Sequence, residues 1–371
     1  MAYIVLGFTI LYTICVWLLY RGWRQTPCFV SPRDFPLISA SVVIPVRNEA
    51  KNIYLLLTDL FLQTYPKPHF EVIVVNDSSE DNTLAEIKNF QDTYPTAGWL
   101  RIIDMKAPLI GKKKALYQGI QVAKGALILT TDGDTRIGQN WLSTIVNFYQ
   151  QKQAKFISSP VALDLPQSFF EKMQVVEFAS LVGTGAGTLH WGRPTMCNGA
   201  NIAFEKAVFE EVGGYEGNWH IASGDDEFLM QKIFRQYPKQ VFFLKNKEAV
   251  VRTAPIPSWK VFFYQRKRWA GKWKVHHSIT VKAVALFVFF YHLLNIFSFF
   301  LLITDYVVIL IHILLKFSIE FIFLRQVHSF LNKNKYSLYF LPLFVLYSFY
   351  AVYIGIMANF KGYEWKNRKL A

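Results

Sequence analysis

Cysteine is scarce in this chain, which argues against a disulfide-rich protein and against a cysteine-based metal site. Among the 371 residues there are three cysteines, Cys15, Cys28 and Cys197, and their spacing fits neither a disulfide framework nor a metal-binding cluster. Isolated cysteines of this kind suit a reducing compartment. The chain also lacks a G-x-G-x-x-G segment after any predicted strand, so a dinucleotide-binding domain has little support.

Acidic residues are outnumbered, with 26 Asp and Glu against 40 Lys and Arg, for a formal net charge of +14. Nucleic acid is one partner that such an excess suggests. Much of the excess, however, stands beside apolar segments, where bases attract anionic lipid head groups and fix membrane topology. These bases are Arg266, Lys267, Arg268, Lys272, Lys274, Lys282, Lys361, Lys366, Arg368 and Lys369. We therefore expect membrane lipids, and no nucleic acid, as partners.

Hydrophobic residues make up 52% of the chain, with 33 Phe, which is high for a purely soluble protein. Four apolar segments are long enough to cross a bilayer: Ala2–Tyr20, Val281–Ile303, Tyr306–Leu324 and Tyr336–Phe360. The first has no basic residue ahead of it and no clear cleavage site, so we expect an anchor rather than a signal peptide.

Three arginines, Arg21, Arg24 and Arg33, follow the first apolar segment. The positive-inside rule therefore places the polar middle of the chain in the cytosol. We expect an integral membrane protein, in the cytoplasmic membrane if it is bacterial. Within the third segment, His312, Lys316 and Glu320 recur at four-residue steps, so they either pair with one another or contact the head group of an acceptor.

The polar middle alternates apolar strands with helical segments, which predicts an α/β fold with a mainly parallel sheet. The expected strands are Ser41–Pro45, Phe70–Val75, Leu100–Ile103, Ala126–Leu129 and Phe156–Ser158. The helices expected between and after them are Ala50–Gln63, about 81–90, one opening at Gly111, Trp141–Tyr149 and Gln167–Leu189.

Carboxylates follow three of these strands, and right-handed crossovers place Glu49, Asp77 and Asp132 on one edge of the sheet. Asp132 and Asp134, separated by Gly133, suit a divalent cation that also takes oxygens from a diphosphate, although Asp-Gly is also a common turn pair. Glu49 and Asp77 can each cap a helix. Their shared edge with Asp132 is better explained by a nucleotide base or ribose.

Two helix starts carry further candidates. Lys112 opens a helix where free N–H groups and cations favour an anion, with solvated lysines as the alternative. Ser223 can cap a helix whose first turn holds Asp225 and Asp226, and crowded carboxylates raise one another's pKa, as a general base requires. Further on, Gln265 and Arg268 lie three residues apart on a helix whose Trp and Phe residues suit the membrane interface.

Four motifs appear in a fixed order: VVIPVRNE with VVNDSS, Asp132-Gly133-Asp134, the acidic pair Asp225-Asp226, and Q-x-x-R-W at Gln265–Trp269. In this order they resemble membrane-bound family 2 glycosyltransferases, the branch with cellulose, hyaluronan and poly-N-acetylglucosamine synthases and ceramide glucosyltransferase. The resemblance covers roughly 41–269 and implies a GT-A domain. The family often has Glu-Asp where this chain has Asp225-Asp226.

The resemblance also implies a role for each candidate. Glu49 and Asp77 hold the uridine of a UDP-sugar, with Pro45, Lys112 and Asp132 in the same donor site. Asp134 and Asp132 bind Mg2+ or Mn2+ at the diphosphate. Asp226, beside Asp225, deprotonates the acceptor, Arg268 neutralises the leaving diphosphate, and Gln265 and Trp269 contact the acceptor.

We thus expect an anchor at 1–24, a cytosolic GT-A domain at 37–255, an interfacial helix at 256–278, a transmembrane region at 279–360 and a basic tail at 361–371. The predicted activity is inverting transfer of one sugar to a lipid or lipid-linked acceptor. A processive polysaccharide synthase with a glycan acceptor, and a catalytically silent membrane scaffold that binds a nucleotide sugar, stay open as alternatives.

Overall fold

The computed structural model describes residues 1–32, 36–106, 111–219, 221, 223–274, 279–360, 363–365 and 368–370. The chain divides into two compact units. The sheet unit comprises Thr26–Asp164 and Leu189–Ala254, and the helical unit comprises Met1–Gln25, Leu165–Thr188 and Pro255–Ala371. Arg33, Lys361 and Lys366, counted above among the bases that set topology, lie outside the described residues.

The sheet unit is built on a seven-stranded sheet with the order β3-β2-β1-β4-β8-β6-β9. Strand β8 runs antiparallel to β4 and β6, and the other ladders of this sheet are parallel. The predicted α/β class with a mainly parallel sheet is confirmed. The strands are β1 (Ala40–Val46), β2 (Phe70–Asp77), β3 (Leu100–Met105), β4 (Leu127–Thr130), β6 (Phe156–Ser158), β8 (Ile202–Glu205) and β9 (Val241–Phe243).

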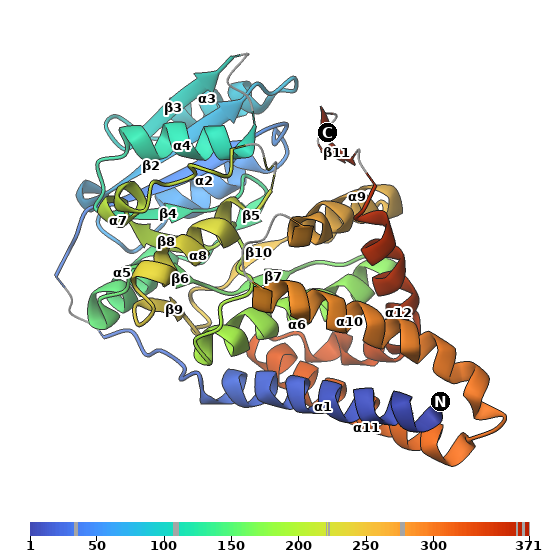
Figure 1. The fold of residues 1–371 in the computed structure, drawn as a ribbon. Helices are drawn as coiled ribbons and strands as arrows, with labels where there is room; N and C mark the ends of the chain where they lie inside the picture. The colour runs from blue at the N-terminus through green and yellow to red at the C-terminus, as the bar shows by residue number, and fades with distance from the viewer. Residues whose placement is uncertain are drawn as a thin grey trace. The chain divides into compact units, whose positions relative to one another are not determined.

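The chain reverses its course across this sheet between β3 and β4 (Figure 1). Helices α2 (Ile53–Phe61) and α3 (Thr83–Thr93) join β1, β2 and β3 in one direction, and α4 (Lys112–Val122) carries the chain back past β1 to β4. Right-handed crossovers then put α4 on the face opposite α2 and α3. The reversal makes β1 and β4 the switch point of the sheet, beyond whose carboxyl ends ligands bind in open α/β folds.

Helix α4 lies very close to the sheet at Gly119. A Cβ added there would fall 2.4 Å from Cγ1 of Val43 and 3.0 Å from Cγ2 of Val75. Glycine therefore permits this close approach, which packs the second half of α4 against β1 and β2.

The sheet unit contains a second, smaller sheet and several further helices. Strands β5 (Thr135–Arg136), β10 (Val251–Thr253) and β7 (Val161–Leu163) form a small separate sheet in that order. The helices are η1 (Lys67–His69), α5 (Trp141–Lys152), α7 (Lys206–Glu211) and α8 (Asp225–Gln236).

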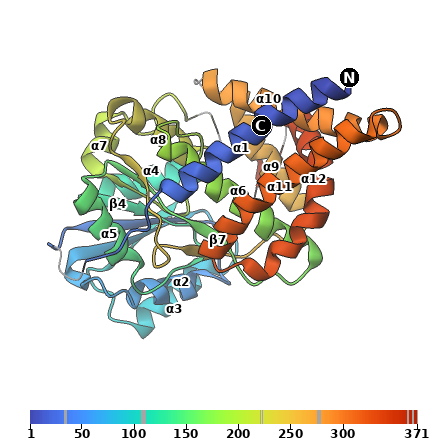
Figure 2. The same cartoon turned by 90° about the horizontal axis from the view of Figure 1, so that it is seen from below.

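The helical unit contains the long apolar helices. Among the described residues, four segments are long and apolar enough to cross a membrane: Ala2–Gln25, Val281–Leu302, Tyr306–Phe330 and Asn334–Met357. In this unit α1 (Ala2–Gln25) packs along α11 (Tyr306–Phe330), and α10 packs on α12 (Figure 2). The other elements are α6 (Phe169–His190), α9 (Trp259–Ala270), η2 (Gly271–Lys274), α10 (Ile279–Ser298), η3 (Phe299–Leu302), η4 (Asn334–Tyr339), α12 (Phe340–Met357), β11 (Tyr363–Trp365) and β12 (Arg368–Leu370).

Polar side chains connect the four apolar helices. His312 of α11 hydrogen-bonds Thr9 of α1 at 2.6 Å and Asn295 of α10 at 2.8 Å, and Asn295 donates to Ser348 of α12 at 2.7 Å. Lys316 and Glu320 form an ion pair at 3.0 Å along α11. Lys316 and Glu320 therefore pair with each other, one of the two alternatives left open by their spacing, whereas His312 bonds side chains of α1 and α10.

Candidate functional site

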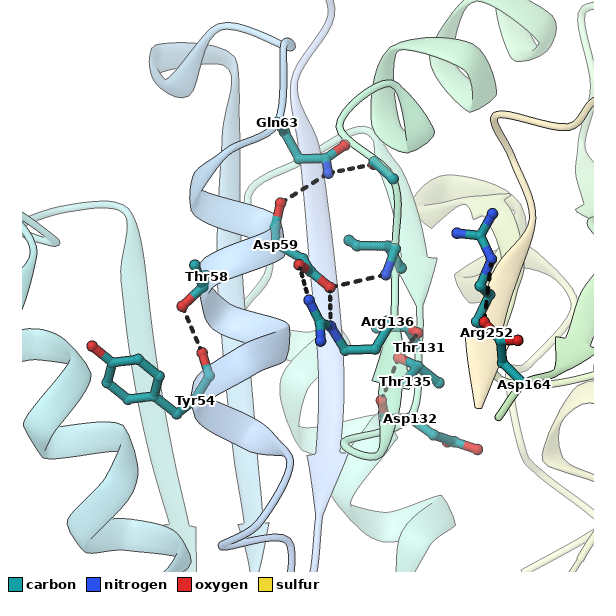
Figure 3. A network of polar contacts seen from close by, with 12 residues as sticks. Tyr54, Thr58, Asp59, Gln63, Thr131, Asp132, Thr135, Arg136, Asp164 and Arg252 are labelled. Atoms are coloured by element: carbon teal, nitrogen blue, oxygen red, sulfur yellow. Dashed lines mark hydrogen bonds and ion pairs between the residues drawn. The ribbon is translucent and has the colours of Figure 1, made fainter. Parts of the chain in front are cut away.

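The Asp132-Gly133-Asp134 segment forms the turn between β4 and β5. Thr135 holds this turn from behind, since its Oγ1 donates to the Asp132 carbonyl at 2.8 Å and lies 2.8 Å from Oγ1 of Thr131 (Figure 3). Both threonines are buried, whereas Asp134 is exposed and Asp132 is partly exposed. The two aspartate side chains are thus carried on a rigid turn at the carboxyl end of β4.

A clamp from α2 fixes the strand that follows the turn. Asp59 accepts from Nε of Arg136 at 2.6 Å, from Nη2 of Arg136 at 2.9 Å and from the Ile137 amide at 3.1 Å (Figure 3). Gln63, one helical turn later, donates to the Gly138 carbonyl at 2.8 Å. Sequence reasoning missed this clamp, because Asp59 and Arg136 lie far apart in the chain and neither belongs to a motif.

The ends of β1 and β2 are joined by Arg47. Its Nη1 donates to the Asp77 carbonyl at 3.0 Å, and its Nη2 pairs with Glu80 at 2.8 Å. Asn48 and Ser78, just beyond the two strands, both have positive φ, at 52° and 51°. Both strands therefore end in sharp turns that bring their polar side chains to one place.

Glu49 and Asp77 lie at this edge without acting as the N-caps of α2 or α3. The N-cap residues of those helices are Asn52 and Asn82. Asp77 instead accepts from the Gly111 amide at 2.8 Å. Glu49 packs against the aspartate turn, since a Cβ on Gly133 would fall 2.9 Å from Cγ of Glu49.

Pro45 is buried near the end of β1. Proline has no backbone N–H to donate to a neighbouring strand. On the side of β4 this loses no hydrogen bond, because β1 pairs with β4 only from Ala40 to Val43. The strand can therefore carry proline where it emerges at the switch point.

Lys112 links the aspartate turn to the acidic pair. Its Nζ lies 2.6 Å from Oδ1 of Asp132, with the two side chains 23% and 33% exposed. Burial lowers the pKa of Lys112, but the negative charges of Asp132, Asp225 and Asp226 outweigh that effect, so the pKa is raised and the ammonium stays charged. The alternative left open for Lys112 was a lysine that simply faces water. The structure argues against it, because the side chain is largely buried and paired with Asp132.

The prediction that Ser223 caps α8 is wrong. The N-cap residue is Gly224, with φ 78°, and no side chain caps the helix. Glycine adopts this left-handed backbone without strain, so the chain turns one residue later than a serine cap requires. Asp225 and Asp226 consequently occupy the first positions of α8.

Asp226 is oriented by backbone amides. Its Oδ2 accepts from the Gly199 amide at 2.7 Å and its Oδ1 from the Glu227 amide at 2.7 Å. The Gly199 carbonyl in turn accepts from Oγ1 of Thr130, the last residue of β4, at 2.7 Å. The small-residue segment around Gly199 therefore ties the catalytic candidate Asp226 to the strand that carries the aspartate turn.

Two further groups support the acidic pair. Tyr215 is buried, and its burial together with the charges of Asp225 and Asp226 raises its pKa, so the phenol stays neutral. Lys113 is buried, and its Nζ donates to the carbonyls of Asn218 and Ile221 at 2.7 Å each. Lys113 thus holds the loop that leads to α8, a role that the run of three lysines did not reveal.

The remaining candidates lie on α9 in the helical unit. Gln265, Arg268 and Trp269 are all partly buried. Among residues 265–269 the buried base is Arg266, which pairs with Glu177. Counting Arg266 among the bases that face lipid head groups was therefore wrong. Its side chain is buried in an ion pair with Glu177, which lies 89 residues away in the sequence.

Comparison with protein families finds a match over a little less than half of the chain. The family model described as Glycosyl transferase family 2 matches residues 41–213. This segment is a family 2 glycosyltransferase domain. It contains Glu49, Asp77, Lys112 and both aspartates of the turn between β4 and β5.

Curated relatives of this glycosyltransferase domain come from archaea and bacteria. "Glycosyltransferase AglE" of Haloferax volcanii is 29% identical over 194 residues, which cover 50% of this chain and 58% of that protein. "Probable glycosyltransferase YdaM" of Bacillus subtilis is 24% identical over 253 residues, which cover 67% of this chain and 56% of that protein. The match thus spans little more than half the length of these relatives.

A solved structure shares the fold. The mannosyltransferase PcManGT from Pyrobaculum calidifontis, in complex with GDP-Man and Mn2+, matches with a TM-score of 0.57 and 18% sequence identity, covering 92% of this chain and 95% of that one. The α/β sheet unit is therefore a GT-A fold, accompanied by apolar helices at the N-terminus and in the C-terminal region.

The carboxylates of the glycosyltransferase domain fit a metal ion only in part. Within the described part of the chain, no group of three or more His, Cys, Asp or Glu side chains is arranged to hold one. Mg2+ usually takes one or two carboxylates and completes its shell with water and substrate phosphates. Asp132 and Asp134 fit such a site, which a diphosphate would complete.

Proposed function

We propose that this protein transfers a sugar from a nucleotide-sugar donor to a lipid or lipid-linked acceptor at the membrane. The observation that carries the proposal is the meeting of Asp132, Lys112 and the acidic pair Asp225-Asp226 at the switch point of a GT-A sheet. A cation between two acidic motifs suits a diphosphate that must be held next to a general base.

The donor occupies the edge formed by β1, β2 and β4. Glu49 and Asp77 hold the nucleoside, with Pro45 at the end of β1 beside them, and Lys112 and Asp132 face the diphosphate. Asp132 and Asp134 would hold Mg2+ or Mn2+, which would supply positive charge for the diphosphate. The related fold solved with GDP-Man and Mn2+ supports a nucleotide sugar and a divalent cation.

Asp226 is the base of the proposed reaction. It removes the proton from the acceptor hydroxyl, whose oxygen bonds to the anomeric carbon while the bond from that carbon to the diphosphate oxygen breaks. Attack opposite the leaving group inverts the anomeric configuration. Asp225 adds negative charge beside the base, Arg268 neutralises the diphosphate, and Gln265 and Trp269 contact the acceptor.

A lipid acceptor is supported by the helical unit. Four segments of the described chain have the length and apolarity of membrane spans, and the bases after α1 favour a cytosolic glycosyltransferase domain. The domain boundaries proposed at 1–24, 37–255, 256–278, 279–360 and 361–371 follow from the same reasoning.

The test is transfer by isolated membranes that contain the protein, offered a panel of labelled UDP- and GDP-sugars, with Mg2+, with Mn2+ and with chelator. We expect metal-dependent label in an organic-soluble product of fixed size. A product of growing length would instead indicate a processive polysaccharide synthase. Nucleotide binding without transfer from any donor would support a catalytically silent scaffold.

A further inference from the structure

Arg266 and Glu177 form a buried ion pair between α9 and α6 in the helical unit. Nε of Arg266 donates to Oε1 of Glu177 at 2.9 Å, and Nη2 contacts Oε2. The two side chains are 5% and 6% exposed. Burial lowers the pKa of Arg266, but the Glu177 carboxylate outweighs it and raises the pKa, so the pair is ionic.

The guanidinium of Arg266 also contacts both neighbours that we assign to the acceptor. Its Nη1 donates to Oε1 of Gln265, and its Cζ lies 4.4 Å from the ring centroid of Trp269. The same Cζ lies 4.4 Å from the ring centroid of Phe262. Tyr350 of α12 donates to Oε1 of Glu177 at 3.1 Å, so the carboxylate is fixed as well.

Stability alone does not explain this arrangement. Removing two charges from water is costly, and an apolar pair of similar volume is often as stable or more so. An arginine differs from an apolar side chain in fixing the orientation of its neighbours. The planar guanidinium binds a carboxylate in one plane and stacks on aromatic rings.

We propose that Arg266, anchored by Glu177, is a positioning residue that fixes the Gln265 amide and the Trp269 ring for the acceptor. The inference rests on the proposed function in one respect, the assignment of Gln265 and Trp269 to the acceptor. Arg266 occupies a variable position of the Q-x-x-R-W motif, so the motif alone does not point to it.

The first test compares kinetics of three variants. Glu177→Gln and Arg266→Lys should each lower kcat/KM for the acceptor at least tenfold while changing the donor KM less than twofold. Lys260→Gln, which removes an exposed cation from the same helix, is the matched control and should leave both constants unchanged. Equal losses toward donor and acceptor, or no loss, would overturn the proposal.

The double variant Glu177→Leu with Arg266→Met separates positioning from stability. Because it leaves no unpaired charge, its thermal unfolding temperature should stay near that of the wild type, whereas its acceptor defect should persist. Restoration of both stability and acceptor kinetics would show that the pair is merely structural, and would overturn the proposal.

A readout independent of transfer is the 19F resonance of Trp269 in protein labelled with 5-fluorotryptophan, assigned with Trp269→Phe. The double variant should shift and broaden this resonance. An unmoved resonance would overturn the positioning role whatever the activity. A wild type that transfers no sugar would overturn the proposed function, while a shifted resonance would still support the positioning of Trp269 by Arg266.

Discussion

Lys112 illustrates how one side chain joins motifs that are distant in sequence. Its ammonium contacts Asp132 and is attracted by Asp225 and Asp226, which begin a helix more than a hundred residues later. A bound diphosphate brings negative charge to the same place, so the lysine offsets repulsion between substrate and protein.

Lys112→Gln should weaken binding of a nucleoside diphosphate about tenfold, roughly 1.4 kcal/mol, because the phosphates lose a cation while the carboxylates remain. Calorimetric titration of the purified protein measures the affinity. Lys124→Gln, an exposed lysine after the end of α4, is the control and should bind as the wild type does. Equal affinity in both variants would remove Lys112 from the donor site.

Single residues are also where the sequence was least informative. Arg266 stands among bases beside an apolar segment, and only its distant partner Glu177 reveals that it is buried. Ser223 fits the pattern of a helix cap, yet Gly224 takes the position because its backbone adopts the left-handed turn without strain. Tertiary partners and backbone angles of this kind leave no local signal.

At the scale of elements, the sequence predicted most of the sheet unit. The long apolar runs that become β1, β2, β3 and β4, and the helical periodicity between them, were sufficient because buried strands and crossover helices have distinct patterns. The antiparallel strand β8, the strand β9 and the small sheet of β5, β10 and β7 were not predicted. These strands have two to four residues each, and the strands with which they pair lie far away in the sequence.

Gly119→Ala should destabilise the packing of α4 on the sheet. Alanine favours a helix by up to ~1 kcal/mol over glycine, but overpacking a tight interface costs about 1–3 kcal/mol, so we expect a net loss. Thermal unfolding in detergent should show a lower midpoint. Gly138→Ala is the control, since a Cβ there meets only the Glu248 carbonyl at 3.9 Å. A midpoint that rises in Gly119→Ala would contradict the close approach.

At the scale of the whole molecule, charged groups lie within a predicted membrane span. Lys316 is 1% exposed and pairs with Glu320, which also accepts from Tyr12 of α1 at 2.6 Å. Unpaired charges at this depth are costly, so the pair helps to specify how α1 and α11 pack.

Glu320→Gln should lower the free energy of unfolding by roughly 3 kcal/mol, because Lys316 would be left buried without its counter-charge. Unfolding in detergent measures the change. Replacing both residues by Leu should recover most of the loss. If Glu320→Gln unfolds as the wild type does, the pair has no part in holding these helices.

The orientation of the glycosyltransferase domain can be tested at Cys28, which is exposed in the sheet unit. In a variant with Cys15 and Cys197 replaced by Ala, a membrane-impermeant maleimide should leave Cys28 unlabelled in intact cells and label it after the cells are opened. A permeant maleimide is the control and should label it in both. Labelling of intact cells by the impermeant reagent would place the domain outside the cytosol.

The most direct test of the account is Asp226→Asn, because asparagine keeps an oxygen for the Gly199 amide while losing basicity. Single-turnover transfer and nucleotide binding are measured on the same preparation. Loss of a general base typically costs 10²–10⁴-fold, so we expect transfer to fall at least a hundredfold with binding unchanged. Transfer at the wild-type rate would contradict the assignment of Asp226 as the base.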